Sequence, residues 1–148
     1  MKYHAKKKPV MTEEERKRIY SSGDYRSLSD SQRREFRHVV EDLDGRRLLK
    51  VTDVPIIASY ARNVLLARLA SKELEKRGIL LEEEDKYHGT KVKQNPAVDV
   101  LQRAQRALED TAIRLGITPT GRKRLPGDGQ KKSELDTFME EMNHGSNA

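Results

Sequence analysis

The residues that could do chemistry in this sequence are a few histidines and one run of carboxylates. No histidine has a partner histidine three or four residues away, as a helical metal site needs. Residues 82–85 form the one dense acidic run. On a strand, alternation sends Glu82 and Glu84 to one side and Glu83 to the other, whereas a two-metal nuclease needs carboxylates from several elements. The pattern favours a solvated hairpin, with a metal nuclease centre as the alternative. The histidines are His4, His38, His88 and His144.

Signatures of other enzyme classes are missing from the sequence. There is no P-loop, no nucleophile elbow and no glycine-rich phosphate loop. There are no cysteines, so neither disulfides nor thiol chemistry are expected. No apolar run reaches the roughly 18–20 residues of a membrane span, and the basic N-terminus lacks the apolar stretch of a signal peptide. We therefore predict a cytoplasmic protein without catalysis, metal, cofactor or membrane partner.

Basic residues are the strongest indication of a partner. The net charge is +6, and residues 1–50 hold 14 Lys and Arg against 9 Asp and Glu. Such a balance favours nucleic acid, whose phosphates bind Lys and Arg in a salt-dependent, largely sequence-independent way. The alternative is an ordinary solvated surface balanced by nearby acids and, for the last cluster, ion pairs between subunits. The candidate contacts are Lys6, Lys7, Lys8, Arg16, Lys17, Arg18, Arg33, Arg34, Arg37, Arg122, Lys123 and Arg124.

Helix start signals place two smaller helices in the N-terminal part. Thr12 with Glu15, and Ser29 with Gln32, each match a capping box. The first helix is expected to end near Gly23. The second, over residues 29–45, carries apolar residues at i, i+3, i+4 and i+7, which form one face. They are Phe36, Val39, Val40 and Leu43.

Two longer helices follow, separated by a predicted β-hairpin at residues 79–94. The first runs over residues 53–78, with Asp53 as its cap, and the second begins at Asn95 and ends at Gly116. The first is apolar on most of its sides, so we expect neighbouring copies of the chain to cover it. The predicted oligomer interface is Ile57, Ala61, Val64, Leu65, Leu69, Leu101 and Leu108.

The C-terminal part begins with a short helical piece from Thr118–Pro119 to about Leu125. A Gly- and Pro-containing linker separates it from a short acidic amphipathic segment. The apolar face of that segment either docks onto a partner protein or is a frayed end. It consists of Leu135, Phe138, Met139 and Met142. The predicted division is thus a basic N-terminal region (1–50), an oligomerisation core of two long antiparallel helices (51–125), and a linker with an acidic tail (126–148).

The order of these elements resembles the small subunit of bacteriophage terminase, in the family common to phages of Gram-positive and other bacteria. The resemblance covers residues 28–125. It includes "GRRLLKVTD" before the long helix with "SYAR", "NPAV" at the start of the next, and "LGITPTGRKRL" at its end. Here Gly121 stands where the family more often has Ser, and Phe36 where it often has Trp.

The resemblance implies a mainly α-helical DNA-packaging component in the host cell cytoplasm. Such subunits assemble into rings, here expected to have eight to ten copies, recognise the packaging start on double-stranded viral DNA, and recruit and regulate a large subunit with the ATPase and nuclease. The family does not fix which residues touch DNA. The main alternative is a dimeric helical transcription regulator that reads a major groove with residues 29–66, although their connection is long for a helix-turn-helix.

Overall fold

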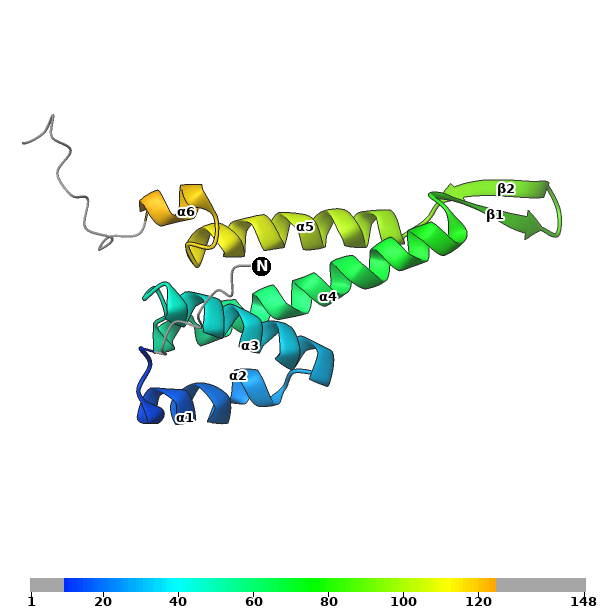
Figure 1. The fold of residues 1–148 in the computed structure, drawn as a ribbon. Coiled ribbons are helices and arrows are strands. Elements are labelled where there is room, and N and C mark those ends of the chain that lie inside the picture. The colour runs from blue at the N-terminus through cyan, green and yellow to red at the C-terminus, as the bar shows by residue number, and fades with distance from the viewer. Residues whose placement is uncertain (1–9, 125–148) are drawn as a thin grey trace, which may run out of the picture.

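The computed structural model describes residues 10–124, and within them the chain is mainly helical, as predicted (Figure 1). The elements in order are α1 (Glu13–Ser21), α2 (Gly23–Arg26), α3 (Asp30–Gly45), the 3-10 turn η1 (Val51–Asp53), α4 (Val54–Arg77), β1 (Leu80–Asp85), β2 (Gly89–Gln94), α5 (Ala97–Arg114) and α6 (Pro119–Arg124). Figure 1 shows α1 and α2 on one side of α3, and α4 and α5 extending to a projecting β-hairpin. The molecule is therefore elongated.

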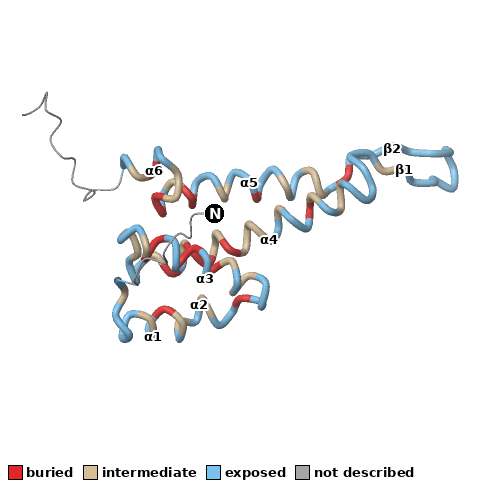
Figure 2. Tube along the Cα trace, in the orientation of Figure 1, coloured by how far each residue is buried: buried red, intermediate tan, exposed pale blue. Residues whose placement is uncertain are grey.

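The N-terminal body consists of α1, α2, α3 and the first half of α4. Both predicted capping boxes are present: Thr12 and Glu15 exchange hydrogen bonds at α1, and Ser29 and Gln32 do so at α3. The predicted apolar face of α3 is buried in the core together with Ile19 of α1 and Leu28. Figure 2 shows buried residues concentrated in this body.

Aromatic rings fill the space between α1, α2 and α3. The Tyr25 ring lies 5.2 Å from the Phe36 ring and 5.1 Å from the Tyr20 ring, and the two tyrosines meet edge to face. Such arrangements add stability beyond the area they bury. Partial burial raises the pKa of the Tyr20 hydroxyl above its usual value. Sequence periodicity identified Phe36 but neither tyrosine.

The long helices are antiparallel, and the predicted hairpin joins them. Strands β1 and β2 pair antiparallel with Glu82 opposite Val92 and Asp85 opposite Gly89. Asn95 ties the base of the hairpin to both helices: its side-chain amide donates to the Gly78 carbonyl (2.9 Å), and its Oδ1 accepts from the Ala97 amide (3.0 Å). Gly78, at φ 79° and ψ 174°, ends α4 in a positive-φ conformation that glycine adopts without steric cost. The hairpin is thus fixed at its base.

The two halves of α4 have different neighbours. Its first half packs against α3 in the core, and an ion pair between Arg68 and Glu35 (2.5 Å) marks where α3 stops covering it. Within a single chain, Ile57 and Ala61 are completely buried in this core. Both were predicted as interface residues. In the single chain they belong to the same core as Leu115, with Ile117 packed against it.

The predicted cap at the start of α4 is wrong. Asp53 precedes the helix, but its carboxylate makes no capping hydrogen bond, because η1 gives it a helical backbone rather than the extended one of an N-cap. Its pKa is raised, and the main cause is burial.

The end of α5 returns to the N-terminal body. Gly116, at φ 69°, ends the helix as predicted, and Leu115 is buried in the same core as the residues of α1, α3 and α4. Thr118 Oγ1 then accepts from the Gly121 amide (3.0 Å) and caps α6. A Cβ at Gly121 would lie 2.3 Å from the Ile113 carbonyl oxygen, so glycine is what lets α6 lie against α5. One core therefore spans the boundary predicted between residues 50 and 51.

Candidate nucleic-acid interface

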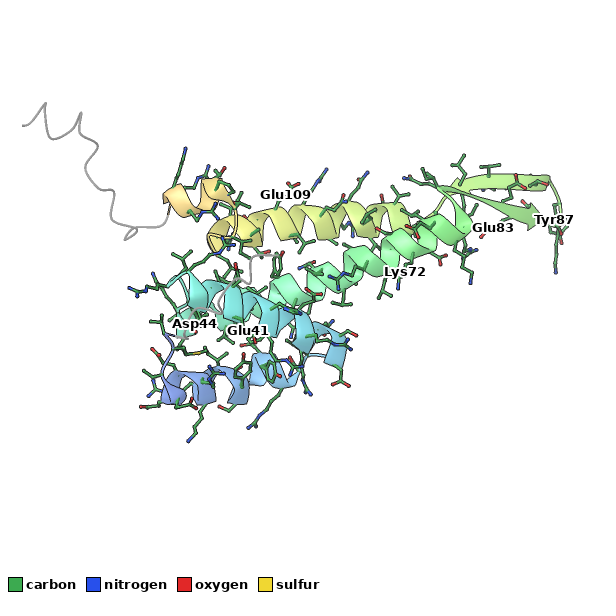
Figure 3. The ribbon with its side chains drawn as sticks, in the orientation of Figure 1. Glu41, Asp44, Lys72, Glu83, Tyr87 and Glu109 are labelled. Carbon is green, nitrogen blue, oxygen red and sulfur yellow. The ribbon has the colours of Figure 1, made fainter. Side chains whose placement is uncertain are left out.

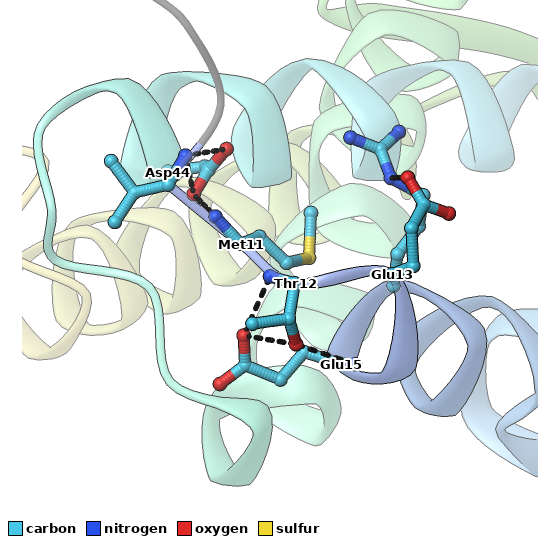
Figure 4. Close-up of polar contacts among 7 residues, drawn as sticks. Met11, Thr12, Glu13, Glu15 and Asp44 are labelled. Atoms are coloured by element: carbon cyan, nitrogen blue, oxygen red, sulfur yellow. Dashed lines mark hydrogen bonds and ion pairs between the residues drawn. The ribbon is translucent and has the colours of Figure 1, made fainter.

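The basic arm predicted at Lys6, Lys7 and Lys8 lies outside the described residues, but the point where the chain enters the body is well defined. Asp44, in the last turn of α3, is only 6% exposed. Its carboxylate accepts hydrogen bonds from the backbone amides of Val10 (3.2 Å) and Met11 (2.8 Å) (Figure 4). Within residues 10–124 it has no ion-pair partner.

This position for a carboxylate is unfavourable in two ways, since it is buried and lies at the negative end of a helix. The amides of residues 10 and 11 offset that cost, and the N-terminus of α1 follows directly after them. Asp44 therefore anchors the segment that joins the basic arm to α1. Sequence reasoning missed it, because nothing local in α3 indicates a partner more than thirty residues away.

Of the predicted basic residues of α1, Lys17 and Arg18 are exposed and Arg16 is partly buried. Arg18 forms an ion pair with Glu14 (2.7 Å), and Arg16 lies 3.9 Å from Glu13. Lys17 is exposed and has no ion pair among the described residues. Two of the three charges are thus partly neutralised by the acids of their own first turn.

Arg33 is committed to the fold. Its guanidinium donates to the carbonyls of Arg26 (2.8 Å) and Tyr25 (3.4 Å) and lies 5.5 Å from the centre of the Tyr25 ring. It also lies 3.7 Å from the carboxylate of Asp30. These contacts hold α2 against the start of α3. Its predicted role as a DNA contact is untested, and the charge remains at the surface.

The turn between α2 and α3 gathers more positive charge than the sequence suggested. Arg62, from α4, donates to the Ser27 hydroxyl (2.8 Å) in this turn, next to Arg26. Arg34 and Arg37 follow on α3 and are exposed, and Arg37 donates to the Arg33 carbonyl (3.3 Å). Asp30 and Glu41 lie on the same helix. We call this set the α2–α3 basic cluster. It consists of Arg26, Arg33, Arg34, Arg37 and Arg62.

The basic residues of α6 form a separate group. Arg122 donates to the Ile117 carbonyl (3.0 Å), while Lys123 and Arg124 are exposed. Figure 1 shows α6 beside the end of α5, with α3 and α4 between it and α1. A single chain therefore does not bring α6 and the α1 residues into one basic surface.

Within residues 10–124, the hairpin included, no group of three or more His, Asp or Glu side chains is arranged to hold a metal ion. Glu83 instead forms an ion pair with Lys93 on the facing strand, and Tyr87 at the tip is 87% exposed (Figure 3). Within residues 10–124, no helix has both the length and the apolar character needed to cross a membrane.

The other predicted interface residues lie on the two long helices, α4 and α5. Leu69 is 62% exposed, and its neighbour Leu66 is also exposed. Val64, Leu65, Leu101 and Leu108 are partly exposed. The apolar tail residues Leu135, Phe138, Met139 and Met142 lie outside the described residues.

The fold and these surfaces define a class: an elongated, mainly helical protein with basic N-terminal helices and a long helical hairpin whose apolar side chains are incompletely covered. Comparison with protein families gives the particular family. The model of the phage terminase small subunit matches residues 33–132, more than half of the chain, so the chain belongs to that family. Comparison with curated proteins and with solved structures gave no significant match.

Proposed function

We propose that this chain is the regulatory subunit that recognises viral DNA at the packaging start, assembles into a ring and recruits the large ATPase-nuclease subunit in the host cytoplasm. The family match carries this proposal. As part of the same proposal, the chain has no catalytic activity of its own, and the ATPase and nuclease belong to the large subunit.

The α2–α3 basic cluster supports the DNA-binding part of the proposal. Three residues, Ser27 to Ser29, separate α2 from α3, a length of connection found in helix-turn-helix motifs. Arg33, Arg34 and Arg37 lie in the first half of α3, the region of a recognition helix that contacts a major groove. In contrast, residues 46–53 separate α3 from α4, so this pair, predicted as the reading unit of a dimeric regulator, has the longer connection.

Salt dependence tests the DNA contacts. Replacing Arg34 and Arg37 with Gln should weaken binding to duplex DNA and reduce the salt slope by about 0.9 per lost phosphate contact. Lys6→Ala, Lys7→Ala and Lys8→Ala together should act in the same way. An unchanged affinity and slope in either variant would remove that group from the interface. Lys123→Gln with Arg124→Gln tests α6 separately.

Exposed apolar residues on α4 support assembly. An exposed leucine pair in a small, highly charged chain indicates a surface that another protein covers. Light scattering after size exclusion should give a mass eight to ten times the 17.0 kDa chain. Leu69→Asp should lower that mass while leaving the helical content of the chain intact. A wild-type monomer or dimer would contradict the ring and favour the dimeric regulator.

A further inference from the structure

One face of α4 loses its cover halfway along the helix. Up to Arg68 it faces α3, and beyond that point Leu69, Lys72 and Lys76 follow at spacings of three and four residues, which place them on one side. All three are exposed, and neither lysine has an ion pair among residues 10–124. Figure 3 shows Lys72 on the side of α4 away from α5. We call Leu69, Lys72 and Lys76 the α4 stripe.

The β-hairpin carries a face of matching character. Strand alternation and the pairing register put Leu80, Glu82, Glu84 and Val92 on one side. Leu80 and Val92 are 62% and 55% exposed. Glu83 points to the opposite side, where it pairs with Lys93, whereas Glu82 and Glu84 have no ion pair within the described residues. We call Leu80, Val92, Glu82 and Glu84 the hairpin face.

The two surfaces agree in order, charge and length. Each begins with a leucine and ends with two like charges, basic on the α4 stripe and acidic on the hairpin face, where Val92 lies opposite Glu82. From Leu69 to Lys76 the helix rises about 10 Å, and from Leu80 to Glu84 the strand rises about 13 Å. Laid side by side in the same direction, they would bring leucine to leucine and glutamate to lysine.

The two surfaces cannot meet within one chain. The hairpin projects beyond the end of α4 (Figure 1), and Asn95 holds its base to Gly78 and Ala97. We propose that the hairpin face of one copy covers the α4 stripe of the next copy, a contact that deepens and rests on the proposed ring assembly. Made head to tail, such a contact repeats from copy to copy around a ring, whereas a reciprocal exchange between two copies would close a two-fold dimer. The assembled mass distinguishes the two arrangements. Two hairpin faces meeting each other would oppose acid to acid.

Charge reversal in two separate variants tests this pairing. One variant carries Glu82→Lys and Glu84→Lys, and the other carries Lys72→Glu and Lys76→Glu. Each alone places like charges across the contact, and we expect self-association to weaken by roughly tenfold or more. In an equimolar mixture the hairpin of each variant matches the α4 stripe of the other, so the assembled mass should return. Light scattering measures all three samples, and circular dichroism verifies that each variant keeps its helices.

The matched control is Glu14→Lys with Glu41→Lys, which changes the net charge as much as the hairpin variant does. Both glutamates are exposed on α1 and α3, away from the hairpin. This control should assemble like the wild type.

Three results would overturn the contact: variants that assemble normally, variants that separate but do not recover on mixing, or a Lys72→Glu, Lys76→Glu protein that assembles but loses DNA binding. The last would assign the α4 stripe to DNA. A wild-type protein that is already monomeric would instead overturn the assembly proposal itself, together with this contact.

Discussion

The N-terminal body and the projecting half of the molecule bury their apolar side chains to very different extents. In the body, Phe36, Ile19, Leu43 and Val40 are fully buried, and these side chains of α1 and α3 belong to one core. In the projecting half, the side chains buried between α4 and α5 include the small residues Ala70 and Ala104, while larger apolar residues face outwards (Figure 2). Because hydrophobic stabilisation scales with buried apolar area, the body gains most of it within the single chain.

Because of this difference in burial, the two halves depend on different contacts. The body should keep its fold as an isolated chain, whereas the projecting half has apolar surface that remains for a neighbour to bury. Substitutions in the body should therefore change the free energy of unfolding, and substitutions in the projecting half should mainly change association.

Phe36→Ala should destabilise the chain by about 3–5 kcal/mol, because it removes the ring that packs against Tyr20 and Tyr25 and leaves a cavity. Tyr87→Ala, at the exposed hairpin tip, should change stability by less than about 0.5 kcal/mol. Urea unfolding at equal protein concentrations measures both. Comparable losses in the two variants would contradict the division of the molecule into these halves.

Gly121→Ala should cost about 1–3 kcal/mol, because the new Cβ would meet backbone atoms of Ile113 at 2.3 and 2.9 Å that cannot move aside. The matched control is Gly45→Ala, at the end of α3, where a Cβ meets nothing within 4 Å. Thermal unfolding should show that control equal to the wild type or more stable. If both variants behave alike, α6 does not depend on its close approach to α5.

Asp44→Asn should cost about 1–2 kcal/mol, because it removes the charge that strengthens the hydrogen bonds from Val10 and Met11. Asp42→Asn is the control: Asp42 lies on the same helix in an exposed ion pair with Arg46, which contributes at most about 1 kcal/mol. Hydrogen exchange should show the Val10 and Met11 amides losing protection in the Asp44 variant alone. Unchanged protection would mean that Asp44 does not hold this segment.

The smallest expected effect is a pH dependence from the α1 cap. Hydrogen bonds from the Thr12 amide and hydroxyl lower the pKa of Glu15 below its usual 4.5. An acid whose pKa is lower in the folded state than in the unfolded state stabilises the fold at pH values above its unfolded pKa. That contribution is lost as the pH falls through the pKa of the folded state. The stability difference between wild type and Glu15→Gln should be constant near neutral pH and shrink below about pH 4.5. A difference independent of pH down to 2 would exclude the cap as its source.

Local patterns in the sequence predicted much of this fold. Both capping boxes, the face of α3 and the hairpin between two long helices depend on neighbouring residues, and each is confirmed. The cap at Asp53 failed because η1 changes the backbone there. For the candidate site, charge patterns predicted Arg34 and Arg37, and their DNA contact stays a prediction. Those patterns could not reveal that Arg62 reaches Ser27 or that Asp44 binds Met11. Those contacts depend on how distant helices are placed, which periodicity does not encode.

The return of Leu115 to the N-terminal core sets an order of events during synthesis. Its partners in that core include Ile57 and Val54, which leave the ribosome before the rest of α4, the hairpin and α5. At about 5–20 residues per second, several seconds separate them from Leu115. During that interval the N-terminal body of the nascent chain lacks Leu115, and its core exposes apolar surface. Unfinished chains on the same polysome would therefore be the most prone to aggregate.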